Sequence, residues 1–367
     1  MAGVFYDAAA GSGKTTHLAR LAAAHTDGRV LFTTFTDENT DEIGRVFLRE
    51  HRHAPGNVDI VPWYTFLLRE GVKPYQGSVG LGDEEICGIK LINGASALRS
   101  RKGDLRHYAL RQSDGGLRVY SDKVAELALY IDEKVEGLVF DRISRLYSMV
   151  CIDEVQDMSG YDLEFIAAII DKVKDVRLAG DLRQATYRTS NVTKNKQYCA
   201  KGFGRFLLDR HLDCSIDSET LRTCHRCSQE IVDLADALYP NFPATVSSAD
   251  TFPDEDHAGV FLVRESDAAA YNERYGAACL VHDKRTKVPS DVRAQNMGAV
   301  KGRTFDRVLL FPTSKMRDWL FNHDANLEQA TRAKLYVAIT RARLSVAVVI
   351  PDHLACDLPS GFSVWSC

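Results

Sequence analysis

No run of apolar residues in this chain is long enough to cross a membrane, although hydrophobic residues make up 45% of its 367 residues. Internal repeats and low-complexity tracts are missing as well. The first residues lack the basic stretch and apolar run of a secretion signal. We therefore expect a soluble, cytoplasmic protein without membrane partners, divided by its length into two or three domains.

Neither charge nor cysteine dominates the composition. The 46 basic and 50 acidic side chains leave a net charge of -4, so nucleic acid could be bound only through a local basic groove. The basic stretch 99–118 is either the floor of such a groove or a solvated face. Nine scattered cysteines, an odd number, fit reduced thiols in the cytosol rather than a disulfide framework.

A stretch near the start of the chain has the strongest chemical signature. It lies between an apolar run at 4–6 and a helical pattern at 17–24, the order that a phosphate-binding loop requires. Gly11 and Gly13 let the backbone turn sharply and bring N–H groups against phosphate oxygens. Lys14 supplies charge for the outer phosphates, and Thr15 supplies a hydroxyl for magnesium. The predicted nucleotide ligands are Ala10, Gly11, Ser12, Gly13, Lys14, Thr15 and Thr16.

Two further apolar strands end in polar residues. Strand 148–152 leads into Asp153, which can hold magnesium, and Glu154, which can orient and deprotonate an attacking water. Strand 176–179 leads to Gln184, which can hydrogen-bond a γ-phosphate or its water, with Tyr187 close behind. The alternative for either segment is an ordinary polar turn at the surface.

Alternating strand and helix patterns predict an α/β fold with parallel sheets that are covered on both faces. The predicted strands are 4–6, 29–34, 58–62, 148–152, 176–179, 259–263, 278–281, 308–311 and 345–350, and the predicted helices include 17–24, 41–51, 121–136 and 228–239. The alternation loosens over about 75–145, which we interpret as a small insertion. A lysine-bearing connection near 194–201 divides the chain into predicted domains 1–195 and 196–367.

Arginine occurs in two motifs of the second α/β region, at Arg226 and at Arg341. An arginine delivered to a phosphoryl-transfer site can stabilise charge on the transferring group. A rival interpretation of the first motif is a zinc site, because His211, Cys214, Cys224 and Cys227 have a tolerable spacing for that metal.

In their order along the chain, these motifs resemble those of the UvrD/Rep/PcrA class of superfamily 1 helicases. The order is Ala-x-x-Gly-x-Gly-Lys-Thr, Thr-Phe-Thr, Asp-Glu-x-Gln-Asp, Gly-Asp-x-x-Gln-Ala-x-Tyr, His-Arg, Lys-Gly-x-x-Phe-Asp and Val-Ala-x-Thr-Arg-Ala-Arg, and it runs from Ala8 to Arg343. The resemblance implies an α/β fold of two tandem RecA-like P-loop NTPase domains with parallel sheets and a small helical insertion in the first.

The same resemblance implies an ATP- and Mg²⁺-dependent translocase or helicase on single-stranded DNA, with 3′ to 5′ polarity. Because the insertions that help the class to unwind a duplex are small or missing here, we also expect a nuclease or second ATPase as partner. Its ATPase site, at an interface of the two domains, would comprise Lys14, Thr15, Asp153, Glu154, Gln184, Arg226 and Arg341, with His225 and Gly302 near the nucleotide. The positions that match strand contacts are Phe35, Thr36, Trp63, Tyr64, Thr65, Phe66, Tyr187, Lys301 and Arg303. The aromatic rings among them either stack on bases or belong to a buried core.

The chain departs from that class in ways that predict loose base selectivity and weak unwinding when it acts alone. His225 replaces an aromatic that stacks on adenine, Thr304 replaces a glutamate near the ribose, and no glutamine precedes Ala8. The second domain has no room for the large insertion of the class. Two alternatives are an ATP-gated recognition or loading subunit for a nuclease, and an RNA helicase of the viral superfamily 1 type, which shares the loop and the Gly-x-Thr-Phe-Asp pattern.

Overall fold

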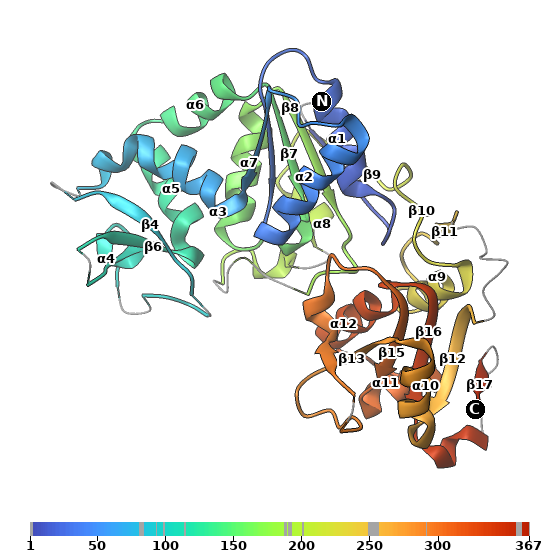
Figure 1. The fold of residues 1–367 in the computed structure, drawn as a ribbon. Helices are drawn as coiled ribbons and strands as arrows, with labels where there is room; N and C mark the ends of the chain where they lie inside the picture. Colours follow the sequence, from blue (N-terminus) through green and yellow to red (C-terminus); the bar gives the residue numbers. More distant parts are fainter. Residues whose placement is uncertain are drawn as a thin grey trace. The chain divides into compact units, whose positions relative to one another are not determined.

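The computed structural model describes residues 3–80, 84–92, 94–97, 100–113, 115–186, 189, 193–199, 202–248, 257–290, 292–356 and 362–366. The chain forms two compact units. Unit 1 comprises Met1–Asp7, Lys14–Leu182 and Tyr187–Asp217, and unit 2 comprises Ala8–Gly13, Arg183–Thr186 and Ser218–Cys367. Each unit is built on a six-stranded sheet (Figure 1). Over the described ranges, every helix is too short or too polar to span a membrane.

The large sheet of unit 1 has the strand order β3-β2-β7-β8-β1-β9, and every neighbouring pair is parallel. The strands are β1 (Gly3–Asp7), β2 (Val30–Thr34), β3 (Val58–Pro62), β7 (Met149–Asp153), β8 (Asp175–Gly180) and β9 (Cys214–Asp217). All residues of β2 and β7 are buried, as expected of central strands with both faces covered. Because the strands are parallel, their carboxyl ends share one edge of the sheet.

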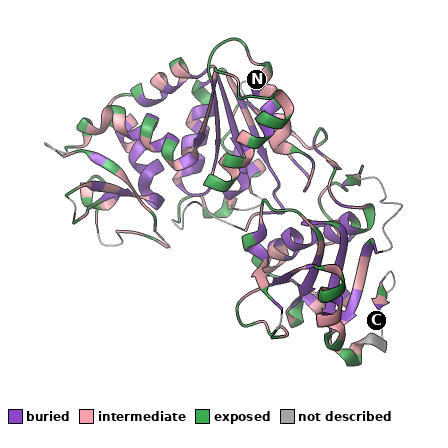
Figure 2. Ribbon diagram, in the orientation of Figure 1, coloured by how far each residue is buried: buried purple, intermediate pink, exposed green. Residues whose placement is uncertain are grey.

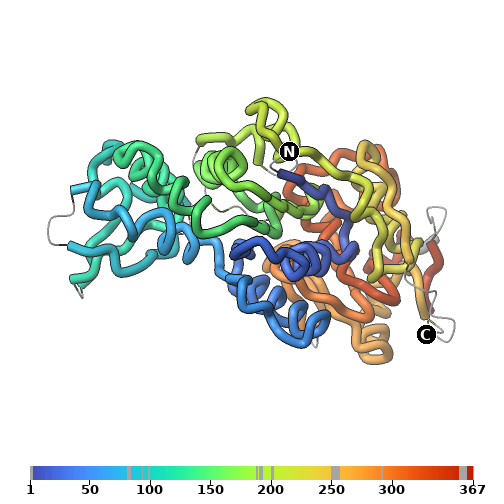
Figure 3. Tube along the Cα trace, turned by 90° about the horizontal axis from the view of Figure 1, so that it is seen from above, coloured from blue at the N-terminus to red at the C-terminus, as the bar shows by residue number. Residues whose placement is uncertain are grey.

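Helices cover both faces of this sheet. On one face lie α1 (Lys14–Ala24) and α2 (Asp37–His51), and on the other lie α7 (Tyr161–Lys172) and α8 (Phe203–Asp209) (Figures 1 and 3). Helix α2 begins four residues before the predicted start at 41 because Thr36 caps it, and the Thr36 side chain accepts the N–H of Asn39. The short α3 (Trp63–Phe66) continues into a π-helical turn (Leu67–Val72) and a 3₁₀ segment (Lys73–Val79).

The insertion within unit 1 contains a small sheet in addition to the helices that we predicted. Its strands lie in the order β4-β6-β5, with β4 (Ile86–Lys90) parallel and β5 (Ala109–Arg111) antiparallel to β6 (Leu117–Tyr120). Its helices are α4 (Leu105–Tyr108), α5 (Val124–Lys134) and α6 (Leu138–Leu146). Both α5 and α6 pack against α7, so the insertion is attached through helices (Figure 1).

Ser121 does not cap α5 as predicted. It opens a 3₁₀ turn (Ser121–Lys123), and its hydroxyl accepts the N–H of Ile92 instead. Helix α5 therefore starts at Val124, and the predicted helix 121–136 is shorter at both ends.

The large sheet of unit 2 has the order β14-β13-β15-β16-β12-β17, again with parallel neighbours. Its strands are β12 (Gly259–Arg264), β13 (Ala278–Val281), β14 (Ala294–Asn296), β15 (Phe305–Phe311), β16 (Ala342–Ile350) and β17 (Ser363–Trp365). A pair of short strands, β10 (Thr223–Cys224) and β11 (Val246–Ser247), forms a separate parallel sheet. The helices are α9 (Gln229–Asp236), α10 (Ala268–Tyr275), α11 (Ser314–Phe321) and α12 (Gln329–Ile339).

Side-chain alternation divides the core of unit 2 into two layers. Val308 and Leu310 face a cluster that contains residues of α9, α11 and α12, whereas Leu309 and Phe311 face a cluster with α10. Both faces of the central strands are therefore buried (Figure 2), which explains why these strands are continuously apolar in the sequence.

The boundary between the two units differs from the predicted division at residue 195. Strand β9 pairs with β1, so residues up to Asp217 belong to unit 1. Only four residues long and half-exposed, β9 lies at the edge of the sheet and has no long apolar run to mark it in the sequence.

Candidate functional site

The start of α1 and the end of β7 meet in unit 1. Lys14 and Thr15 are the first two residues of the helix, and Asp153 and Glu154 lie where the strand ends. The Lys14 Nζ lies 2.7 Å from Glu154 Oε1. The Thr15 hydroxyl donates to Asp153 Oδ2 at 2.6 Å. The fold thus brings together four residues that the sequence analysis selected in two separate motifs.

This cluster is largely withdrawn from water. Asp153 is 2% exposed and Glu154 is 7% exposed. Burial raises the pKa of Asp153, and the neighbouring Lys14 charge acts in the opposite direction. A hydroxyl and a buried carboxylate are hard oxygen ligands, which suit Mg²⁺ together with phosphate oxygens and water. The N-terminus of α1 beside them favours an anion.

Glu154 has an unusual backbone conformation, and the side chain of Gln156 contacts its carboxylate. Its φ is 61°, in the left-handed region, which costs a residue other than glycine about 1 kcal/mol or more. Gln156 Nε2 donates to the Glu154 carboxylate. A Cβ on Gly180, at the end of β8, would collide with Gln156 Oε1, so the glycine leaves room for this side chain. Gln156 was not among the predicted site residues, although its place in Asp-Glu-x-Gln-Asp was a signal for it.

Two glycines shape the loop between β1 and α1. Gly11 has a φ of 71° and Gly13 a φ of 77°, which glycine adopts without strain. A Cβ on Gly11 would lie 2.9 Å from Cys224 Sγ and 3.0 Å from Arg226 Cβ, so a larger residue does not fit there. The Ser12 hydroxyl is buried and has no hydrogen-bond partner among the described residues, and an oxygen of a bound anion would satisfy it.

Two other predicted loop ligands, Ala10 and Thr16, have side chains that offer little to a bound nucleotide. Ala10 is buried in a core cluster of unit 2 and has only backbone groups to offer. Thr16 is half-buried, and its hydroxyl accepts from Arg49 at 3.5 Å.

Arg341 and Gln184 are in contact within unit 2. Arg341 is 2% exposed, and its Nη2 donates to Gln184 Oε1 at 3.2 Å. Its Nη1 donates to the Arg303 carbonyl at 3.3 Å, and its Nε donates to the Val337 carbonyl at 3.1 Å. Three motifs that are far apart in the sequence therefore converge on one buried guanidinium.

His225 and Arg226 follow β10 and lie beside the loop residues of unit 2. The His225 N–H donates to the Gly11 carbonyl at 2.9 Å. Arg226 Nη1 donates to the Thr340 carbonyl at 3.1 Å. The His225 side chain is exposed, with Nδ1 2.6 Å from the Ser248 hydroxyl. Both residues therefore lie beside Gly11 of the proposed phosphate-binding loop.

The turn before β15 holds three further predicted residues. Gly302 has a φ of 83°, so the turn requires glycine at this position. The exposed Arg303 guanidinium lies over the Phe305 ring at 5.0 Å and donates to Gln295 Oε1 at 2.5 Å. Lys301 is half-buried. A strand contact by Lys301 and Arg303 stays a prediction.

Trp63 and Phe66 are fully buried, which corrects their predicted contact with nucleic-acid bases. Their ring centroids lie 6.0 Å and 5.9 Å from that of Phe165 in α7. Trp63 Nε1 also donates to Asp162 at 2.8 Å. A base cannot stack on a ring whose faces are covered, so these two residues form the aromatic core that was the alternative interpretation.

Other predicted strand contacts lie nearer the surface. Phe35 and Tyr64 are half-buried, with ring centroids 5.5 Å apart, and the Tyr64 hydroxyl donates to the Thr189 carbonyl at 2.8 Å. Thr65 is exposed, whereas the Thr36 hydroxyl is occupied as the cap of α2. Tyr187 lies outside the described residues. These strand contacts therefore stay predictions.

The cysteines of the His-Arg motif contact each other. The Cys227 N–H donates to Cys224 Sγ at 3.4 Å, and the hydrogen bond from the Cys227 thiol lowers the pKa of Cys224 to about 6. The described part of the chain, which includes His211 and Cys214, holds no group of three or more potential ligands of this kind. His211 and Cys214 belong to unit 1, whereas Cys224 and Cys227 belong to unit 2, so the zinc interpretation stays an untested alternative.

Comparison with known proteins identifies the family. A model of the viral superfamily 1 RNA helicase core domain matches residues 122–349, more than half of the chain. The chain belongs to this family. The viral class was the alternative in the sequence analysis, and membership confirms the broader prediction of a superfamily 1 helicase core. The matched range includes Asp153, Glu154, Gln184, Arg226 and Arg341, but it does not include the loop at 8–16.

Solved helicase structures from arteriviruses are similar to this viral-type chain. The crystal structure of arterivirus nonstructural protein 10 (helicase) has 16% sequence identity over 96% of this chain, with a TM-score of 0.46. The complex of arterivirus nonstructural protein 10 with DNA has 17% identity over 96% of this chain, with a TM-score of 0.44. The chain spans 60% and 62% of these two proteins. No curated protein matches the chain by sequence.

Proposed function

We propose that this chain is a nucleoside triphosphatase whose hydrolysis is stimulated by single-stranded nucleic acid. The observation that carries the proposal is the contact of Lys14 and Thr15, at the end of a glycine loop, with Glu154 and Asp153. Family membership supports it as well, and it does so without the loop, because the matched residues 122–349 lie outside it.

The residues of unit 1 fit ATP with Mg²⁺. Thr15 and Asp153 would hold the ion, which when bound neutralises charge on the phosphates. Lys14 would exchange its Glu154 partner for the outer phosphates. Glu154 would then accept a proton from the attacking water, while Gln156 keeps the carboxylate in place.

The residues of unit 2 fit charge stabilisation during hydrolysis. Arg226 lies against the loop at Gly11, and Arg341 holds Gln184. We assign the two arginines to the charge that develops on the transferring phosphoryl group, and Gln184 to the γ-phosphate or its water. We assign His225, the neighbour of Arg226 in the sequence, to the position beside the base.

The polymer is single-stranded RNA or DNA, and the family match favours RNA. The UvrD-like signatures Asp-Glu-x-Gln-Asp and Thr-Arg-Ala-Arg favour single-stranded DNA with 3′ to 5′ movement. On the protein side, Phe35, Tyr64, Thr65, Lys301 and Arg303 are the residues that we assign to the strand.

An ATPase assay on the purified chain with single-stranded RNA, single-stranded DNA, duplex and no polymer tests the proposal. We expect single strands to raise turnover by about tenfold or more, a barrier change of about 1.4 kcal/mol. The stimulation should weaken as salt rises, because backbone contacts release counterions. The Lys14→Ala variant is the control for a contaminating ATPase. The proposal is contradicted if no ATP hydrolysis is detected, or if none of the polymers changes the rate of hydrolysis.

Unwinding needs more than strand-dependent hydrolysis. Separation of a duplex requires a wedge, and we expect this chain to unwind efficiently only with a partner such as a nuclease or a second ATPase. A forked-duplex assay with RNA and with DNA, each with a 3′ or a 5′ tail, measures unwinding and polarity together. Robust unwinding by the isolated chain would show that no partner is needed. Strand-stimulated hydrolysis without unwinding under any condition would favour a loading or recognition subunit instead.

A further inference from the structure

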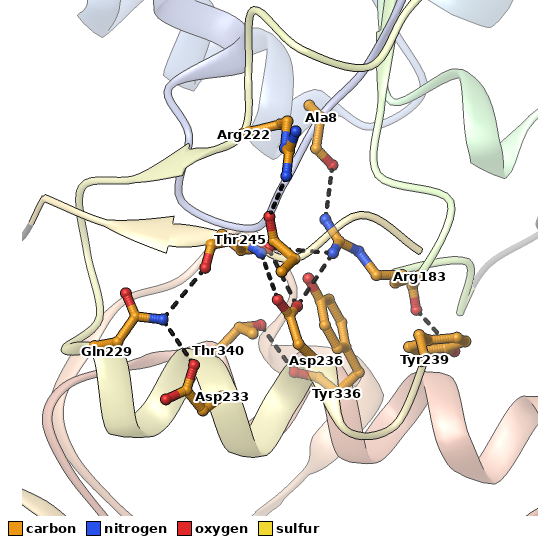
Figure 4. Close-up of polar contacts among 11 residues, drawn as sticks. Ala8, Arg183, Arg222, Gln229, Asp233, Asp236, Tyr239, Thr245, Tyr336 and Thr340 are labelled. Carbon is orange, nitrogen blue, oxygen red and sulfur yellow. Dashed lines mark hydrogen bonds and ion pairs between the residues drawn. The ribbon is translucent and has the colours of Figure 1, made fainter. Parts of the chain in front are cut away.

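A buried arginine next to Gln184 contacts the first residue of the phosphate loop. Arg183 is 5% exposed and belongs to unit 2 together with the loop residues 8–13. Its Nη2 donates to the Ala8 carbonyl at 3.3 Å, and its Nη1 donates to Asp236 Oδ1 at 3.2 Å and to Thr245 Oγ1 at 3.3 Å (Figure 4). One guanidinium therefore joins three chain segments: the loop, α9 and the segment before β11.

Aromatic rings enclose the same guanidinium. Its central carbon lies 5.3 Å from the centre of the Tyr336 ring and 5.7 Å from that of Phe242. The Arg183 carbonyl accepts from the Tyr239 hydroxyl at 3.2 Å (Figure 4). Both sides of the residue, its backbone and its side chain, are therefore fixed within unit 2.

Burial makes these contacts obligatory. A guanidinium stays charged in a protein, so a buried one requires acceptors for its donors. Asp236 supplies the opposite charge, and it is itself held by the N–H and hydroxyl of Thr245 at 2.6 Å and 3.1 Å. The Ala8 carbonyl is a further acceptor, and Ala8 is fully buried. The direction of this carbonyl is thus set by a charged group, which gives a stronger hydrogen bond than a neutral donor.

Other residues of unit 2 form hydrogen bonds with the backbone of the loop at several successive positions. After the Ala8 carbonyl, the Ala9 N–H donates to the Leu221 carbonyl at 2.8 Å, and the Gly11 carbonyl accepts from His225 at 2.9 Å. The glycines beyond Ala8 have no conformational preference of their own that would fix the loop. The peptide planes of a phosphate-binding loop are useful only if they are oriented before the ligand arrives.

We propose that Arg183 is a positioning residue that orients the phosphate loop through the Ala8 carbonyl. This inference rests on the proposed nucleotide-binding function of the loop. Arginine suits the task because its planar fork reaches acceptors on separate segments at once, whereas lysine offers a single point charge. Arg183 also precedes Gln184, the partner of Arg341, so the same short segment holds the loop and the arginine motif.

The test compares Arg183→Lys and Arg183→Met with the wild-type chain and with Arg332→Met. Arg332 is the matched control, because its guanidinium lies in the same unit, 5.8 Å from the centre of the Tyr239 ring. The first readout is hydrogen exchange of the loop peptide 8–13 in the nucleotide-free protein. The second is the split between KM and kcat for ATP.

We expect faster exchange in the loop of both Arg183 variants, and wild-type exchange in Arg332→Met. KM for ATP should rise about tenfold in Arg183→Lys, the loss of one charge-assisted hydrogen bond, and further in Arg183→Met. The value of kcat should change less, because an oriented loop binds the ground state and the transition state alike.

Wild-type loop exchange in a folded Arg183→Lys or Arg183→Met protein would overturn the proposal, as would equal changes in Arg332→Met. If Arg183→Met does not fold, Arg183→Lys decides alone. If the wild-type chain neither binds nor hydrolyses ATP, the proposed function fails, and loop exchange still decides whether Arg183 orients the loop.

Discussion

Replacement of Glu154 by glutamine should have two opposite effects on nucleotide chemistry. Hydrolysis should fall by about 10²- to 10⁴-fold, because an amide cannot accept the proton of the attacking water. Nucleotide binding should nevertheless become tighter. In the structure Lys14 is paired with Glu154 at 2.7 Å, and it must give up this partner to meet the phosphates.

The structure sets the size of the second effect. The side chains of Lys14 and Glu154 are 18% and 9% exposed, so their pair is screened less than one at the surface. Coulomb attraction at this separation is roughly 6 kcal/mol at an effective dielectric constant of ~20, most of it offset by desolvation. The net worth of a hydrogen bond to a charged group is about 1.5–3 kcal/mol. Glu154→Gln should therefore lower Kd for ATP by about 10- to 100-fold.

Titration with a fluorescent ATP analogue measures Kd, and single-turnover hydrolysis measures the chemical step. Glu126→Gln is the matched control, because it breaks the buried pair, 2.9 Å long, between Lys123 of the 3₁₀ turn and Glu126 of α5. The control should leave both quantities unchanged. Near wild-type hydrolysis in Glu154→Gln would refute the assigned base. An unchanged or higher Kd would refute the exchange of partners by Lys14.

Three further predictions concern other parts of the molecule. Arg226→Ala and Arg341→Ala should each reduce kcat by roughly 10³-fold with a smaller loss of nucleotide affinity. If both variants hydrolyse ATP at the wild-type rate, neither arginine stabilises the transition state. GTP should support turnover within about tenfold of ATP, because the exposed His225 stands in place of the aromatic residue that stacks on adenine in the UvrD-like class; a strong ATP preference in competition assays would contradict this. Burial, together with the charges of Arg307 and Arg274, lowers the pKa of His257 to about 4 from its ordinary value of 6.5. Below pH 6.5 the unfolded state therefore binds more protons at this histidine than the folded state does. The free energy of unfolding should therefore fall by about 2 kcal/mol as pH drops from 6.5 to 4. Urea titrations should show that this free energy depends less on pH in His257→Phe than in the wild-type chain.

Local patterns in the sequence selected the loop and carboxylate residues that are in contact in the structure. A glycine loop that precedes a helix can be recognised locally, since Gly11 and Gly13 adopt positive φ values without strain. A carboxylate pair that ends a buried strand lies at the ligand-binding edge of a parallel sheet for topological reasons. The contact of Lys14 and Thr15 with Glu154 and Asp153 follows from these two facts.

Burial of aromatic side chains was not predictable in the same way. Phe35, Tyr64 and Trp63 all lie just beyond the ends of apolar strands, yet only Trp63 of the three is fully buried. The difference arises because α7 supplies Phe165 and Asp162 to Trp63. Such a partner is distant in the sequence, so no local pattern marks the ring that it covers.

The α/β class, most of the long apolar strands and the loop and carboxylate residues could be predicted from the sequence, because each depends on neighbours within a few positions. Tertiary structure decided that β9 completes the sheet of unit 1 and that the insertion contains a sheet of its own. It also decided that Arg183 holds the Ala8 carbonyl. These features depend on pairing between distant segments, where short strands and single charged residues gain their role only from the partner that the fold brings to them.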